Sequence, residues 1–149
     1  MSSTRRTRRY AEVGLPYVTL VNVEIRRCPR CRARELVTPR IETLHRLIAR
    51  AIVVQPAVLR PDAIRFLRTW LDLSRDGLAL VLGVRRETAF RWERRRDPCR
   101  MTPSADRLLR LLVANHDPIE QFPVQLFAAE PDAAPRRITF SAPCWERTA

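Results

Sequence analysis

The chain has 149 residues and a formal net charge of +12, and all 28 of its basic residues are arginines. A balance this basic makes a polyanion the expected partner, and the absence of a catalytic constellation or a phosphate-binding loop argues against an enzyme. No stretch approaches the ~20 apolar residues of a transmembrane helix, and four scattered cysteines do not make a secreted disulfide framework, so we expect a cytoplasmic protein.

Residues 1–9, MSSTRRTRR, carry four arginines and no anchor for packing, so we expect a basic disordered arm. Such an arm is either an ordinary solvated terminus or a tail that contacts DNA phosphates or the minor groove. It also resembles an organelle transit peptide, although it lacks the apolar core of a secretory signal. Residues 10–37 form the next module, in which β-branched and aromatic residues from about Tyr17 to Arg26 predict a strand.

A C-x-x-C knuckle, Cys28-Pro29-Arg30-Cys31, follows this strand. Two thiolates at this spacing can share one metal ion, but a structural zinc site needs four ligands. The further candidate ligands are Cys99, Cys144, His45 and His116, and no two of them have the short spacing of a metal-ligand pair. We therefore favour a metal-free knuckle, with an incomplete zinc site on Cys28 and Cys31 as the alternative. The neighbouring arginines are expected to lower the thiol pKa values.

Residues 38–56 are expected to form a connecting helix and a linker, since Thr38 suits an N-cap and Pro39 suits the first helical position. A helix opening at Pro61 and another from Pro103 to Asn115 would flank a central motif in residues 57–116. The apolar positions of the last helix are Leu108, Leu109, Leu112 and Val113. The tail, residues 117–149, is rich in proline and expected to be mostly irregular, with a short strand possible at Arg137–Ser141. Within it, Trp145 is either a docking anchor or part of a frayed end.

The central motif, LSRDGLALVLGVRRETAFRWE, predicts two short helices joined by a turn at Gly83. Ser74 suits the N-cap of the first helix, and Gly83 suits a sharp, left-handed exit from it. The second helix would run from about Arg86 to Trp92. This arrangement is the helix-turn-helix, in which the second helix enters the DNA major groove.

The motif resembles the phage-repressor (Xre-type) helix-turn-helix. The chain keeps the scaffold letters of that pattern at Ser74, Leu78, Ala79, Leu82, Gly83, Val84, Thr88, Arg91, Trp92 and Glu93. It departs from the pattern at Arg75, Gly77, Arg85, Phe90 and Arg95. The resemblance also implies a partly buried ion pair between Arg68 and Glu93 that fixes the first helix of the domain to the recognition helix.

The resemblance implies which side chains meet DNA. The expected base contacts are Arg86, Glu87, Phe90 and Arg91, and the expected phosphate contacts are Arg75, Arg85, Arg94 and Arg95. Phe90 either touches a thymine methyl group or folds back into the core. Gly77 within a helix and the missing cap oxygen at Arg85 each cost about 1 kcal/mol. The alternative to specific binding is thus a folded bundle with weak, electrostatic affinity for nucleic acid.

Taken together, Gly14-Leu15, Cys28–Cys31, Pro39–Ala49 and Ile64–Arg68 resemble the MqsA-type antitoxins, which are transcriptional regulators. The resemblance implies a dimeric repressor or autorepressor of a toxin–antitoxin system, and possible binding of an RNA-cleaving toxin. The first C-x-x-C pair of that family's zinc module is missing here, so no cofactor is expected unless zinc binds the incomplete site. The expected fold class is mainly α, a phage-repressor-like bundle of about five helices preceded by a small β and knuckle module.

Overall fold

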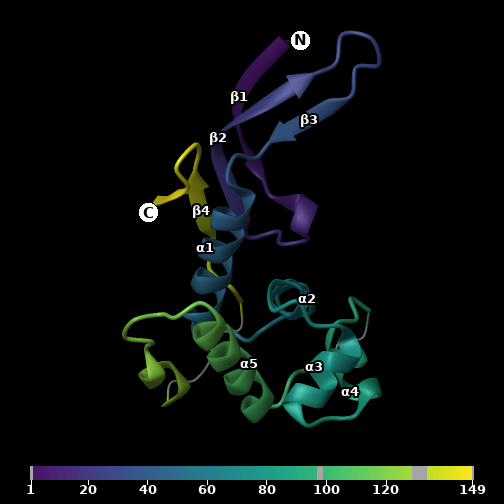
Figure 1. The fold of residues 1–149 in the computed structure, drawn as a ribbon, viewed down its shortest axis with the longest axis vertical. Coiled ribbons are helices and arrows are strands. Elements are labelled where there is room, and N and C mark those ends of the chain that lie inside the picture. The colour runs from purple at the N-terminus through teal and green to yellow at the C-terminus, as the bar shows by residue number, and fades with distance from the viewer. Residues whose placement is uncertain (1, 97–98, 129–133, 149) are drawn as a thin grey trace. The chain divides into compact units, whose positions relative to one another are not determined.

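In the computed structural model of the chain, the described residues are 2–96, 99–128 and 134–148. They divide into two compact units (Figure 1), unit 1 being Met1–Ile48 with Arg137–Ala149 and unit 2 being Ala49–Arg136. Unit 2 is therefore inserted between the two segments of unit 1. Among the described residues, no helix is both long enough and apolar enough to span a membrane.

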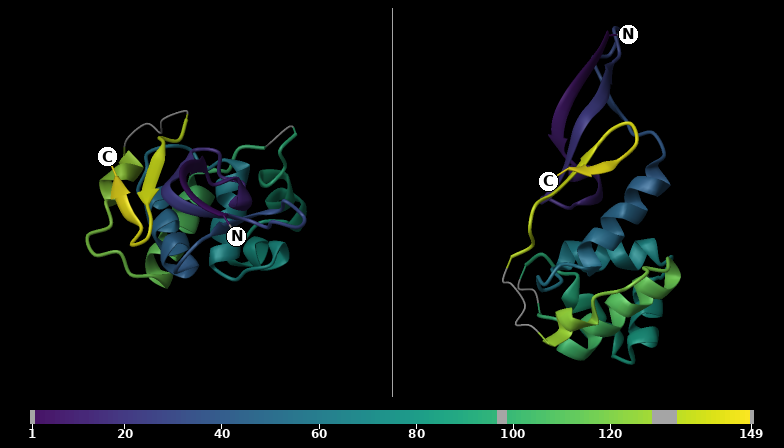
Figure 2. Two further views of the ribbon diagram at one scale, coloured as in Figure 1. Left: turned by 90° about the horizontal axis from the view of Figure 1, so that it is seen from above. Right: turned by 90° about the vertical axis from the view of Figure 1, so that its left-hand side faces the viewer.

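Unit 1 is organised around strand β2, which has a partner on each edge. β1 runs antiparallel along one edge, while β3 (antiparallel) and β4 (parallel) pair with different halves of the other. β5 extends the sheet from β4 as an antiparallel neighbour. Figure 2 shows β1 alongside β2, with the yellow β4–β5 hairpin close to the same strand. The strands are β1 (Ser2–Arg9), β2 (Val18–Arg27), β3 (Arg34–Val37), β4 (Ile138–Ser141) and β5 (Glu146–Thr148), and a short 3-10 helix, η1 (Ala11–Val13), precedes β2.

The core face of β2 is set by alternating apolar residues. Val18, Leu20 and Val23 are buried. The spacing from Leu20 to Val23 is three residues rather than two, so the alternation slips by one residue there. Asn22 lies at the slip with a φ of 59°, in the left-handed region. A local irregularity of this kind bends the strand and returns its next apolar side chain to the core. The other large side chains that are fully buried in unit 1 are Leu15, Leu44, Ile48, Ile138, Phe140 and Trp145, and Tyr10 is buried beside them at 3% exposure.

The predicted mainly α fold class is wrong. The described residues form five α-helices, but these accompany a five-stranded mixed sheet to which segments near both ends of the chain contribute. Residues 2–9, expected to be a disordered arm, form β1, and the tail supplies β4 and β5. All eight residues of β1 are exposed and none is apolar, so its composition does not reveal a strand. Backbone pairing with β2 specifies it instead.

Helix α1 (Ile41–Val53) begins later than expected, because Arg40 has a φ of 48° and cannot extend the helix toward Thr38. The carbonyl of Pro39 instead accepts a 2.5 Å hydrogen bond from the indole N–H of Trp145. Trp145 is thus buried in unit 1 and anchors the C-terminal segment there.

Unit 2 is helical, and its centre is made of large apolar side chains from four helices. The fully buried ones are Ile64, Leu67, Leu78, Trp92 and Leu109. Its elements after α1 are α2 (Pro61–Trp70), α3 (Arg75–Leu82), α4 (Arg86–Trp92), α5 (Pro103–His116) and the 3-10 helix η2 (Val124–Ala128).

Candidate nucleic-acid interface

The helix α3 has defined ends on both sides. At its start the Ser74 hydroxyl accepts a 2.9 Å hydrogen bond from the Gly77 N–H, which satisfies one of the unpaired donors of the first turn. At its end Gly83 has a φ of 66°, and the N–H of Val84 reaches back to the Ala79 carbonyl at 2.9 Å. This is the Schellman ending that a left-handed glycine permits. The chain therefore turns sharply into α4.

Helix α4 has one buried side and one exposed side. Ala89 and Trp92 are almost fully buried and hold the helix against the rest of unit 2. Arg86, Glu87 and Arg91 are exposed. With Phe90, which is 40% exposed, all four expected base-contact residues are open to solvent on a short, anchored helix.

Arg86 already has a partner in the free protein. Its Nε lies 2.8 Å from Oδ1 of Asp76 on α3, and both side chains are largely exposed. An exposed pair of this kind contributes only ~0–1 kcal/mol. Arg86 can therefore exchange Asp76 for a base or a phosphate at little cost.

Phe90 does not fold back into the core, which was one of the two positions expected from the sequence. It is 40% exposed, so it is not part of the core, and the guanidinium carbon of Arg75 lies 4.3 Å from the centre of its ring. A cation at this distance from a ring face is attracted by the ring quadrupole. Phe90 thus supports Arg75, one of the expected phosphate contacts, while keeping part of its ring open to solvent.

The end of α4 is fixed by a charge cluster around Glu93, whose side chain is only 2% exposed. The ion pair expected with Arg68 is present, as Arg68 Nε and Nη2 donate to the two carboxylate oxygens at 2.5 and 3.1 Å. Arg75 Nε lies 3.4 Å and Arg65 Nε 3.9 Å from Oε2 of the same carboxylate. Arg68 also donates to the Leu73 carbonyl at 2.8 Å. We call Glu93, Arg65, Arg68 and Arg75 the Glu93 cluster; it connects α2, α3 and the end of α4.

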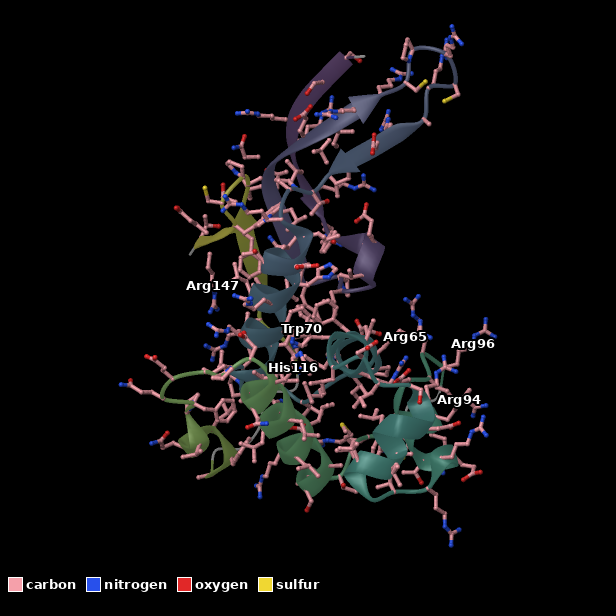
Figure 3. All side chains as sticks on the ribbon, viewed as in Figure 1. Arg65, Trp70, Arg94, Arg96, His116 and Arg147 are labelled. Atoms are coloured by element: carbon pink, nitrogen blue, oxygen red, sulfur yellow. The ribbon has the colours of Figure 1, made fainter. Side chains whose placement is uncertain are left out.

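The remaining expected phosphate contacts flank α4. Arg85 occupies its N-cap position without a side-chain cap hydrogen bond, and Arg94 and Arg95 follow its last turn; all three are exposed. Figure 3 labels Arg94 and Arg96 in this following segment, where their side chains extend into solvent. The exposed side of α4 is therefore bordered by guanidinium groups at both ends of the helix.

The C-x-x-C knuckle lies in the turn between β2 and β3. Hydrogen bonds to the Cys28 sulfur lower the pKa of the Cys28 thiol. The largest effect comes from the backbone N–H of Cys31, the next from the backbone N–H of Arg30, and a smaller one from the Cys31 side chain. The sequence predicted that neighbouring arginine charges would lower this pKa. Hydrogen bonds from backbone N–H groups are the main cause instead.

The described residues bring no third His, Cys, Asp or Glu to Cys28 and Cys31. Two thiols do not satisfy a four-ligand zinc site, so the residues described do not fit the metal.

Cys99 and Cys144 are free thiols. The Tyr10 hydroxyl lies 3.0 Å from Nε2 of His45, and burial lowers the His45 pKa. His116 packs edge-on against Trp70, with ring centroids 6.0 Å apart (Figure 3).

One residue of structural importance, Arg110, was missed at the sequence level. It lies on α5 and is only 3% exposed, beside the buried Leu109. Its Nε donates to Asp106 at 2.5 Å, and its terminal nitrogens donate to four backbone carbonyls where α1 ends and the linker begins. Asp106 and Arg110 have the i, i+4 spacing of a helical ion pair, and Arg110 lies on the same face as the apolar Val113. An acidic residue four positions before an arginine that lies on the apolar face of a helix was therefore the sequence signal for a buried ion pair. The four carbonyls belong to Ile52, Val53, Gln55 and Ala57.

Comparison with protein-family models, with curated proteins and with solved structures finds no match for this chain.

Proposed function

We propose that the chain is a sequence-specific DNA-binding transcriptional regulator, acting as a repressor, that inserts α4 into the major groove. The observation that carries this proposal is the exposed, arginine-bearing side of α4 on a helix whose end is fixed by the Glu93 cluster. A helix that recognises bases needs both exposed polar side chains and a fixed position, because base contacts require side chains held in a defined register on the duplex.

The chemistry of the exposed side suits base recognition. The forked guanidinium groups of Arg86 and Arg91 match the O6 and N7 acceptors of guanine, and the carboxylate of Glu87 can accept from the amino group of cytosine. Arg75, whose position is supported by its contacts with Phe90 and Glu93, is the phosphate contact we propose for α3. Phosphate contacts would set the position on the duplex, and base contacts would set the sequence.

Replacing Arg86 or Arg91 by alanine is expected to weaken binding to a cognate duplex selected from a randomised pool. The loss should be roughly 5- to 150-fold for each bidentate contact to guanine, corresponding to about 1–3 kcal/mol. Binding to a random duplex of the same length should fall much less, because only one charge is removed. Fluorescence anisotropy with both duplexes at one salt concentration measures the two losses.

Arg107→Ala is the matched control, since it removes an exposed arginine from α5 of the same unit. It should leave the preference for the cognate duplex unchanged. Equal losses on cognate and random DNA for Arg86→Ala and Arg91→Ala would contradict base recognition by α4. Failure of the randomised pool to yield a common sequence would contradict sequence-specific binding itself.

A second candidate function, sequence-independent binding of nucleic acid by unit 1, is favoured by the distribution of charge. Unit 1 contains 13 arginines and 5 acidic residues, a balance of +8, whereas unit 2 contains 15 and 11, a balance of +4. Four of the unit 1 arginines lie on the fully exposed strand β1. Charge of this kind supports contacts with phosphates whatever the sequence.

The double replacement Arg6→Thr/Arg9→Thr is expected to reduce the salt dependence of binding to random duplex DNA. In β1 these two arginines lie opposite Val23 and Thr19, whereas Arg5 lies opposite Glu24 and Arg8 pairs with Glu12 at 3.2 Å. If each of the two arginines binds one phosphate, each replacement should lower the slope of log K against log salt concentration by about 0.9, so the pair should lower it by about 1.8.

Threonine is used because it keeps the strand propensity of β1. The control Arg34→Thr/Arg147→Thr removes the same charge from exposed strand positions of unit 1 outside β1. Identical slopes for the two double variants would show that β1 makes no particular contribution, and the second candidate function would then be abandoned.

A further inference from the structure

Unit 2 contains a cavity of about 430 Å³ that neither proposed function uses. Its volume falls in the range of about 300–1,000 Å³ that is usual for small-molecule sites. The wall combines the linker after α1, the segment leading into α5, the first turns of α5 and the 3-10 helix η2. Its apolar lining includes Val58, Met101, Leu126 and Phe127.

The polar lining of the cavity carries a surplus of positive charge. Among the described residues, three arginines, Arg100, Arg107 and Arg110, line it together with a single carboxylate, Asp106. Asp106 is already committed, since it accepts 2.5 Å and 3.2 Å hydrogen bonds from Arg110 and from the Leu59 N–H. Arg110 and Asp106 therefore neutralise each other, and Arg100 and Arg107 remain as the unbalanced charges.

The two unbalanced arginines differ from the other polar groups of the wall in being exposed and without a carboxylate partner among the described residues. Arg107 donates to the Phe127 carbonyl at 2.8 Å through Nη2, and its guanidinium carbon lies 5.7 Å from the centre of the Phe127 ring. Gln55, by contrast, is buried and already bonded through both ends of its amide to the backbone of Arg136. A ligand would thus find guanidinium donors beside an aromatic ring.

From this arrangement we infer that the cavity binds a small organic anion with an apolar body that contains aromatic rings. The anionic group pairs with Arg100 and Arg107, and the rings lie against Phe127 and the neighbouring apolar side chains. Guanidinium forks suit carboxylate, sulfonate and phosphate groups alike, since each presents paired oxygens. This inference goes beyond the proposed DNA-binding function and does not depend on it.

The test uses two fluorescent probes on the full chain. 8-Anilinonaphthalene-1-sulfonate carries an anionic group on a two-ring body with a phenyl substituent, and N-phenyl-1-naphthylamine is its uncharged counterpart. Arg100→Gln/Arg107→Gln should weaken binding of the sulfonate at least tenfold and change binding of the uncharged probe less than about threefold. Arg94→Gln/Arg96→Gln, which removes the same charge from exposed positions of the same unit, should change neither.

Two further variants keep the test decisive. Arg100→Gln alone leaves the Arg107–Phe127 contact in place and should still weaken sulfonate binding severalfold. Leu126→Trp fills part of the cavity and should weaken both probes. Sulfonate binding that is unaffected by the arginine pair, or weakened equally by the Arg94/Arg96 control, would overturn the inference. So would probe binding that Leu126→Trp leaves unchanged.

Discussion

Replacing Arg110 by methionine is expected to lower the free energy of unfolding by about 3–5 kcal/mol, the usual cost of removing one partner of a buried ion pair. Methionine keeps an unbranched apolar stem but leaves the Asp106 carboxylate without its charged partner. It also removes the donors to four backbone carbonyls at the end of α1 and in the linker that follows. Buried acceptors without a donor add to the loss.

Urea unfolding followed by tryptophan fluorescence measures this effect, because Trp70 and Trp92 both belong to unit 2. The control is Arg107→Met, which makes the same chemical change three residues earlier on α5 at an exposed position. It should cost less than about 1 kcal/mol. Similar losses for the two variants would show that Arg110 does not hold the linker to α5.

Replacing Glu93 by glutamine is expected to cost about 3 kcal/mol or more, again because a buried ion pair loses one of its partners. The glutamine amide is nearly isosteric with the carboxylate, so packing changes little. What changes is charge, since Arg68, Arg65 and Arg75 would then face one another without the carboxylate they now share. For a domain of 60–100 residues, each kcal/mol lowers the melting temperature by roughly 4–8 °C.

Glu87→Gln provides the matched control for that variant, because Glu87 is an exposed carboxylate on the same helix. Its effect on stability should stay within about 0.5 kcal/mol. Thermal unfolding followed by circular dichroism at 222 nm compares the two. Equal melting temperatures would mean that the Glu93 cluster contributes no more to stability than a surface charge.

Local signals predicted the centre of unit 2 well. Ser74 and Gly83 act through their own backbone geometry, so the ends of α3 could be placed from a few neighbouring letters. The partnership of Arg68 with Glu93 followed from a resemblance in residue pattern and is present in the structure. Phe90 was harder, because its position depends on Arg75, which comes from another helix.

Two strands of unit 1, β2 and β4, lie where the sequence predicted strands, but β1 and the pairing of the sheet could not be predicted because that information is not local. β1 has no apolar residue, and its pairing with β2 depends on backbone groups that every sequence has. β4 pairs with β2 in parallel across 120 positions, as Val18 faces Ile138 in the register. β1 has no alternation of apolar and polar residues and β4 has only four residues, so neither strand reveals its partner by periodicity. Arg110 was missed because a charged residue on a helix is ordinarily expected to be solvated.

The insertion of unit 2 between two segments of unit 1 has a consequence for biosynthesis. A ribosome completes every residue of unit 2 before it makes β4, so unit 2 can fold while the sheet still lacks its C-terminal strands. Until then, the edge of β2 from Val18 to Val21 lacks the backbone partner that β4 later supplies. The N-terminal module is thus the last to be finished, and truncation at the C-terminus would damage the beginning of the protein rather than its helical centre.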